Sequence, residues 1–87
     1  MEYTKIYIGS NNDTKILELD KIQNILNIWI ESYTIIQATG VWKGTKENTA
    51  IVEIYGTYNL GIIELLKREL KQDTILVVNN FLEVNFK

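Results

Sequence analysis

The sequence predicts one small α+β domain in which two helices pack on one face of a single sheet. Three observations lead to this class. Short segments with the alternating pattern of strands occur near both ends and in the middle of the chain. Two longer segments repeat apolar residues every three or four positions, which is the period of amphipathic helices. The chain has 87 residues, and a chain of this length forms one domain.

The amino-terminal part predicts a strand followed by a helix. Residues 3–8 alternate between two sets of side chains, as a strand with two different faces does, and Gly9 ends the run. From about Glu18 to Glu31, apolar residues at helical spacing form one stripe. The stripe consists of Leu19, Ile22, Ile25, Leu26, Trp29 and Ile30.

The central part predicts two strands joined by a hairpin. Residues 33–42 are rich in the β-branched and aromatic types that strands favour. Residues 43–46 are expected to form the hairpin loop. The return strand is expected from Thr49 to Tyr55, with its more uniformly apolar face in the core. That face consists of Ala50, Val52 and Ile54.

The last part predicts a second helix and two more strands. Thr57 or Asn59 is expected to cap the helix, whose apolar stripe runs from Leu60 to Leu70. A short buried strand follows over residues 74–78. We expect a tight turn at Asn79 and Asn80, because Asn tolerates positive φ, and a last strand over residues 81–86.

The resulting order β-α-β-β-α-β, plus an extra C-terminal strand, predicts a ferredoxin-like sandwich with both helices on one sheet face. The other sheet face must meet solvent, a ligand or another subunit. The chain contains no Cys, so a disulfide cannot stabilise this small domain. Because small domains often gain stability from a second subunit, we expect a homo-oligomer.

Composition excludes several function classes. Without Cys or His, ordinary zinc sites are excluded, and we expect no metal and no cofactor. The net charge of −2 argues against binding to DNA or RNA, which needs a basic face. No apolar run is long enough to cross a membrane, and the amino terminus lacks a signal-peptide pattern. We therefore expect a cytoplasmic protein.

Four short segments resemble a known family. They are Tyr7-Ile8-Gly9, Gly40-Val41-Trp42, Glu47-Asn48-Thr49 and Gln72-Asp73-Thr74. In this order they resemble the small bacterial proteins grouped as domain of unknown function 3574. The resemblance covers most of the chain. It implies a ferredoxin-like domain with no established activity, and it assigns no catalytic residue.

The hairpin supplies the first candidate ligand site. Trp42 and Lys43 are expected near its tip, with Glu47 across from them and Thr49 at the start of the return strand. A Trp at a strand end can stack on a nucleobase while Lys43 contacts a phosphate. The alternative is that Trp42 packs over a sheet edge or a subunit interface, with Lys43 and Glu47 as a surface pair; aromatic residues are commoner in packing than in recognition.

Two further groups are candidates. Ser10 and Asn11 follow the first strand, where backbone N–H groups and small polar side chains can hold an anion; the alternative is a capping loop. Tyr7 and Tyr55 lie on predicted strands. On the face without helices they would form either a stacking platform or, as an aromatic outer face favours, a subunit interface.

These patterns favour a non-catalytic protein. With no His and no Cys, most hydrolytic mechanisms lose their usual base or nucleophile. We expect a homo-oligomeric domain that binds a nucleotide-like small molecule and has no catalytic residue. Abundant Ile, Asn and Lys suit the AT-rich genomes of some bacteria and phages, so an anti-defence sponge that sequesters a nucleotide signal is one concrete version. The alternatives are a small dimeric ferredoxin-like enzyme using Tyr7, Glu53 or Tyr55, and a protein–protein inhibitor using the open sheet face.

Overall fold

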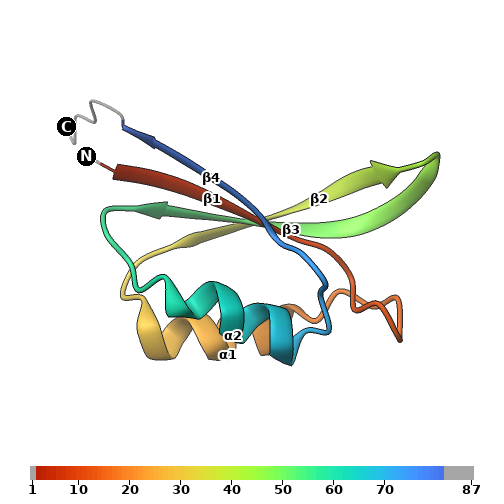
Figure 1. Ribbon diagram of the computed structural model, residues 1–87, viewed down its shortest axis with the longest axis horizontal. Helices are drawn as coiled ribbons and strands as arrows, with labels where there is room; N and C mark the ends of the chain where they lie inside the picture. Colours follow the sequence, from red (N-terminus) through yellow and green to blue (C-terminus); the bar gives the residue numbers. More distant parts are fainter. Residues whose placement is uncertain (1, 82–87) are drawn as a thin grey trace.

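The computed structural model describes residues 2–81, and its elements follow the predicted order (Figure 1). The six elements are β1 (Glu2–Ile8), α1 (Leu19–Trp29), β2 (Thr34–Trp42), β3 (Thr45–Tyr55), α2 (Gly61–Glu69) and β4 (Leu76–Phe81). Among the described residues, no helix is long and apolar enough to cross a membrane.

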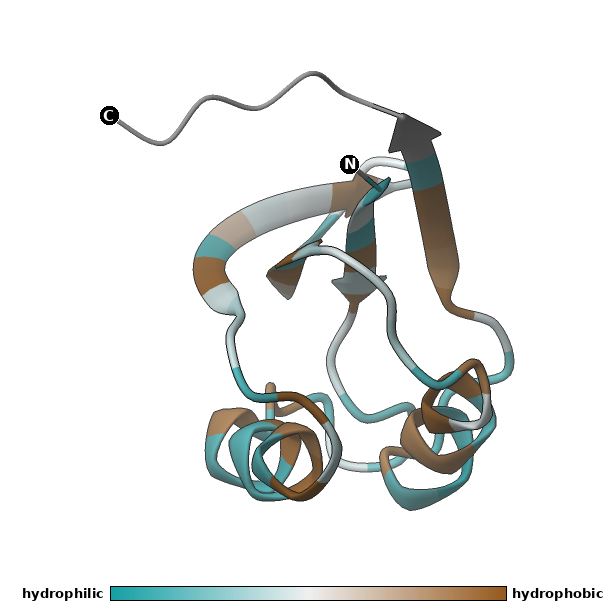
Figure 2. Cartoon of the chain, turned by 90° about the vertical axis from the view of Figure 1, so that its left-hand side faces the viewer, coloured by the Kyte–Doolittle hydropathy of each residue, from teal (hydrophilic) through white to brown (hydrophobic). Residues whose placement is uncertain are grey.

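The four strands form one antiparallel sheet in the order β2-β3-β1-β4. The first strand is therefore central, between β3 and β4. Both helices lie on the same side of this sheet, and its other side has no helix (Figure 2). This arrangement confirms the predicted ferredoxin-like fold, because the split β-α-β topology places the first and third strands side by side.

The core lies between the sheet and the two helices. Alternate residues of β1 and β3 point into it, as period-two patterning requires, and the apolar stripes of both helices close it from the other side. The predicted core face of β3 is confirmed, since its three residues are at most 1% exposed. The largest fully buried side chains are those of Ile6, Ile8, Ile22, Leu26, Ile54, Leu66, Val52 and Thr4.

The hairpin between β2 and β3 has a shorter turn than predicted. Only Lys43 and Gly44 lie between the strands, and Trp42 already pairs with Thr45. Both turn residues have positive φ, 49° for Lys43 and 79° for Gly44, as the central residues of a type I′ turn do. Such a turn follows the right-handed twist of the strands, so β3 begins at residue 45 rather than at residue 49.

The hairpin extends beyond the rest of the sheet. Pairing of β1 with β3 stops at Ile8 and Ala50, while β2 and β3 remain paired as far as the turn. Figure 1 shows this part of the hairpin projecting to the right, above the loop that follows β1. The projecting strands and that loop form the walls of the candidate site.

The predicted turn at Asn79 and Asn80 is wrong. These residues continue β4, where they pair with Thr4 and Tyr3 of the central strand. The Thr4 hydroxyl also donates a hydrogen bond to Asn79 Oδ1 at 2.8 Å. Pairing along β1 thus outweighs the local preference of Asn for turns. The strand begins at Leu76, two residues later than predicted, and the predicted last strand falls, beyond Phe81, outside the described residues.

The helices are close to their predicted positions. The first helix ends two residues before Glu31. The N-cap position of the second helix is Leu60, not Thr57 or Asn59 as predicted. Asn59, one residue earlier, still accepts a hydrogen bond from the backbone N–H of Gly61 at 2.8 Å. This bond satisfies one of the free N–H groups at the start of the helix.

Candidate functional site

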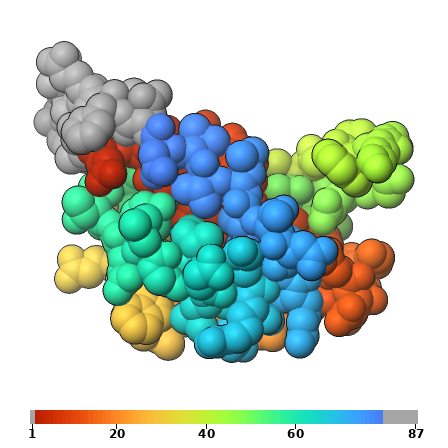
Figure 3. Space-filling model, viewed as in Figure 1, coloured from red at the N-terminus to blue at the C-terminus, as the bar shows by residue number. Residues whose placement is uncertain are grey.

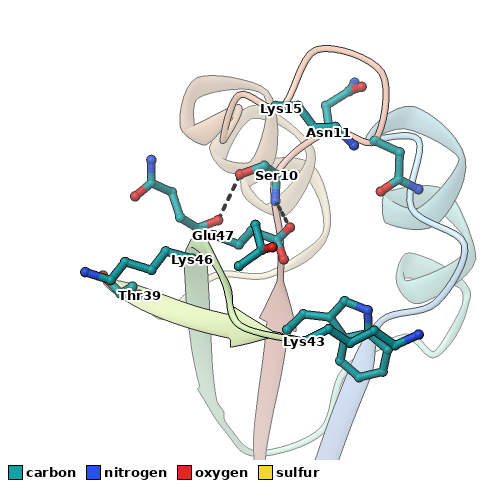
Figure 4. A pocket seen from close by; sticks show the side chains of 11 residues that line it. Ser10, Asn11, Lys15, Thr39, Lys43, Lys46 and Glu47 are labelled. Atoms are coloured by element: carbon teal, nitrogen blue, oxygen red, sulfur yellow. Dashed lines mark hydrogen bonds between the residues drawn. The ribbon is translucent and has the colours of Figure 1, made fainter.

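The main pocket of the described residues lies between the loop after β1 and the projecting hairpin. It is an open pocket of about 880 Å³, lined by loop residues between 10 and 15 and hairpin residues between 39 and 48. Figure 3 shows a recess between these two segments on the surface. In Figure 4 the loop residues lie on one side and the hairpin residues on the other, with Ser10 and Glu47 hydrogen-bonded between them.

The loop is fixed to the rest of the domain at Ser10, which is 5% exposed. Its backbone N–H donates to Glu47 Oε1 at 2.8 Å, and its hydroxyl donates to the backbone carbonyl of Asn48 at 3.0 Å. Its own carbonyl accepts a hydrogen bond from Gln72 Nε2 at 2.6 Å. These three bonds tie the loop to β3 and to the segment that follows α2, so this wall of the pocket is well defined.

Asn11 has a structural role in the loop. Its Oδ1 accepts hydrogen bonds from the backbone N–H groups of Asp13, at 2.8 Å, and Thr14, at 3.2 Å, as in an Asx turn. Its Nδ2 donates to Glu18 Oε1 at 2.6 Å. The side chain thus forms its hydrogen bonds within its own loop. This matches the capping-loop alternative and not the anion-binding one.

The hairpin wall presents an aromatic ring and several cations. Trp42 is 71% exposed, so it does not pack into the core of this chain. The ammonium group of Lys43 lies 5.6 Å from the centroid of the Trp42 ring, within cation–π range. Lys46 and Lys15 also line the pocket. No ion pair between residues of the described part involves these lysines or Glu47, so the expected surface pair of Lys43 and Glu47 does not form there.

Five of the eight predicted ligand-binding residues line this pocket: Ser10, Asn11, Trp42, Lys43 and Glu47. The prediction missed the other residues that line it, which are Asn12, Lys15, Thr39, Thr45, Lys46 and Asn48. Lys46 and Asn48 were missed because the prediction began the return strand at Thr49. The strand structure of residues 45–48 follows from the turn and from pairing with β2.

The other three predicted residues lie elsewhere. Tyr7, Thr49 and Tyr55 alternate with the core residues of their strands, so they lie on the sheet face without helices. There the Tyr55 ring packs against the Tyr3 ring with centroids 4.9 Å apart. The Tyr3 hydroxyl donates a hydrogen bond to Glu53. This cluster is separate from the pocket.

The ionisable groups of that cluster influence one another. The hydrogen bond to Glu53 raises the pKa of the Tyr3 phenol, with a further contribution from burial. Lys5 lies 5.8 Å from the centroid of the Tyr3 ring, and interaction with the Tyr3 hydroxyl raises the pKa of its ammonium group. Among residues 2–81, no group of three or more carboxylates gathers in a way that could hold a metal ion.

Comparison with known proteins gives a structural match only. No family model and no curated protein matches the sequence. A solved structure of a phage SAM lyase without ligand is similar, with 18% identity, a TM-score of 0.68, and coverage of 91% of this chain and 78% of that chain. A phage SAM lyase in complex with S-methyl-5′-thioadenosine is similar with 13% identity, a TM-score of 0.56, and coverage of 91% and 79%. These likenesses show the fold.

The comparison corrects one prediction. We expected a non-enzyme because the chain lacks His and Cys, but the matching structures are lyases, which are enzymes. The prediction of a non-catalytic domain is therefore wrong. The lack of His and Cys excludes only mechanisms in which these residues must supply a base or a nucleophile.

Proposed function

We propose that this chain is a phage-encoded enzyme of the bacterial cytoplasm that cleaves SAM (S-adenosylmethionine) in the pocket between the loop after β1 and the hairpin. The observation that carries the proposal is the chemistry of this pocket: an exposed Trp, lysines that form no ion pair within residues 2–81, and one carboxylate around one open space. The shared fold with phage SAM lyases supports the same function.

The pocket suits the separate parts of such a substrate. The exposed face of Trp42 can stack on the adenine, as aromatic side chains do on bases. Lys43 and Lys46 carry the charge that attracts the substrate's carboxylate, and the hydroxyl and amide groups of the walls can bind the ribose. The carboxylate of Glu47 is available for a positively charged group. A pocket of about 880 Å³ lies within the size range of small-molecule sites, which is roughly 300–1,000 Å³.

The reaction itself requires little acid–base catalysis from the protein. The sulfonium sulfur of SAM is a positively charged leaving group, so breaking its bond to the four-carbon chain sends the electron pair to sulfur and yields the neutral thioether S-methyl-5′-thioadenosine. The carbon left behind gains its new bonding pair from the carboxylate oxygen of the same fragment, which closes a lactone without proton transfer, or from a neighbouring C–H bond, whose proton passes to a water molecule. Neither route needs a His or a Cys, so the enzyme's contribution is to orient the substrate and exclude competing conformations.

The test is incubation of the purified protein with SAM, followed by liquid chromatography and mass spectrometry. We expect SAM to disappear and S-methyl-5′-thioadenosine to appear in equal amount over many turnovers. Heat-denatured protein serves as the control for spontaneous breakdown. If SAM remains intact at stoichiometric protein, this chain is not a SAM lyase.

A further inference from the structure

The absence of a side chain at Gly9 determines where the Glu47 carboxylate lies. A Cβ atom built on Gly9 would lie 2.3 Å from Glu47 Oε1 and 3.0 Å from its carboxyl carbon, closer than non-bonded atoms approach. Gly9 does not have positive φ, unlike Gly44 and Gly56. A Cβ at position 9 would therefore displace the Glu47 carboxylate, which is the end of a flexible side chain, so this glycine matters for the space it leaves rather than for its backbone conformation.

Among the described residues, only one oxygen of the Glu47 carboxylate accepts a hydrogen bond. Its Oε1 accepts the hydrogen bond from the backbone N–H of Ser10 at 2.8 Å, and Ser10 is itself fixed by its bonds to Asn48 and Gln72. Within the described part of the chain, no hydrogen bond reaches Glu47 Oε2, and no lysine comes within ion-pair distance of the carboxylate. A partly buried, positioned carboxylate with an unused oxygen thus lines the pocket.

We infer that Glu47 binds the positively charged centre of the ligand, and that Gly9 and Ser10 hold it in position to do so. The inference rests on the proposed function and specifies its substrate class: nucleosides with a cationic group at the sulfonium position, in preference to neutral thioethers. Attraction by the carboxylate operates on the sulfonium and vanishes once cleavage makes sulfur neutral. The same arrangement therefore favours release of the thioether product.

The preference is measured by isothermal titration calorimetry with two ligands that the enzyme cannot cleave in this way. Sinefungin carries an ammonium group where SAM has its sulfonium, and S-adenosylhomocysteine is a neutral thioether at that position. We expect the wild-type protein to bind sinefungin at least about tenfold more tightly, the scale of one charge-assisted contact.

Two variants change the carboxylate in different ways. Glu47→Gln keeps an oxygen that can accept the Ser10 hydrogen bond but removes the charge. Gly9→Ala keeps the charge but displaces it from its position. In both, we expect the preference for sinefungin to fall to within about threefold of unity while S-adenosylhomocysteine binding persists. Glu53→Gln, which removes a carboxylate from the same strand outside the pocket, is the matched control and should leave the preference unchanged.

The outcomes separate this inference from the proposed function. If both ligands bind the wild-type protein equally, or if Glu47→Gln retains the full preference, the role of Glu47 is wrong while a nucleoside site remains. If neither ligand binds and SAM is not cleaved, the proposed function is wrong and the inference with it. Circular dichroism spectra confirm that the variants are folded before binding is compared.

Discussion

Trp42 contributes a large aromatic surface that this chain leaves exposed. Stacking on a base is worth about 1–3 kcal/mol, so we expect Trp42→Ala to weaken sinefungin binding at least about fivefold. Because the ring is 71% exposed, the melting temperature should stay within about 2 °C of the wild type, as surface substitutions usually do. Trp29→Ala is the control, since Trp29 is also exposed but lies on α1 outside the pocket. Unchanged affinity in Trp42→Ala would remove this ring from the site.

Tyr3 makes the free energy of unfolding depend on pH in the alkaline range. Its hydrogen bond to Glu53 raises the pKa of the phenol, so the folded state holds this proton more tightly than the unfolded state does. The resulting stabilisation is fully present below the unfolded pKa, near pH 10, and is lost as pH rises through the higher pKa of the folded state.

We therefore expect the free energy of unfolding to fall less steeply above about pH 10 in Tyr3→Phe than in the wild type. Glu53→Gln should have the same effect, because it removes the carboxylate that accepts the bond. Urea unfolding curves measured between about pH 8 and pH 11 provide the comparison. Equal pH dependence in all three proteins would show that this hydrogen bond does not couple folding to the proton.

At the scale of elements, the hairpin turn determines how far β2 and β3 project. Gly44 has φ of 79°, and a Cβ atom at this position would meet nothing within 4 Å. A side chain there would therefore cause no clash, and its only energetic cost is the unfavourable positive φ. We expect Gly44→Ala to destabilise the protein by about 1 kcal/mol, equivalent to a melting temperature lower by about 4–8 °C.

Lys43→Asn tests the same turn with a substitution that should not lower the melting temperature. Asn at the first position and Gly at the second is the favoured pair in type I′ turns, so this variant should melt at or above the wild-type temperature. Differential scanning calorimetry of both variants is sufficient. If Gly44→Ala melts like the wild type, positive φ at this position is not a constraint on the hairpin.

The hairpin also shows which elements could be predicted from the sequence. Both helices, the central strand and the core face of β3 were predictable, because each has a periodic pattern of apolar residues. Residues 45–48 have no such pattern, and their strand structure follows from the turn and from pairing with β2. Likewise, Asn79 and Asn80 form part of a strand because of their pairing with β1. Such pairing cannot be read from local propensity.

The candidate site was predictable to the extent that it depends on local sequence. Residues close together in the hairpin were found, whereas Tyr7 and Tyr55, predicted as a separate group on the sheet face without helices, lie on that face and do not line the pocket. Which sheet face a side chain occupies follows from alternation, but the pocket exists only because β1 stops at Ile8 while the hairpin continues. The contact between Gly9 and Glu47 joins positions 38 residues apart, and no sequence pattern indicates it.

At the scale of the whole molecule, the sheet face without helices carries a continuous apolar row. Ile36, Ile51, Tyr7 and Leu76 lie opposite one another across all four strands. Ile36 and Leu76 are among the exposed large hydrophobic residues, and Figure 2 shows that neither helix covers this face. Contiguous exposed apolar surface of this kind is typical of protein–protein interfaces.

We therefore expect the protein to form a homo-oligomer through this face. A stable interface buries at least roughly 600 Å² on each partner, which a four-stranded sheet face can provide. Leu76→Lys places an uncompensated charge at the β4 end of the row and should dissociate the assembly to the 10.1 kDa chain. Leu60→Lys makes the same change at another exposed leucine, at the start of α2, and should leave the assembly intact.

Sedimentation velocity at low micromolar concentration distinguishes these outcomes. A wild-type protein that sediments only as a single chain would show that the apolar row is not an interface between copies. Dissociation of Leu60→Lys while Leu76→Lys stays assembled would place the interface on the helix side instead.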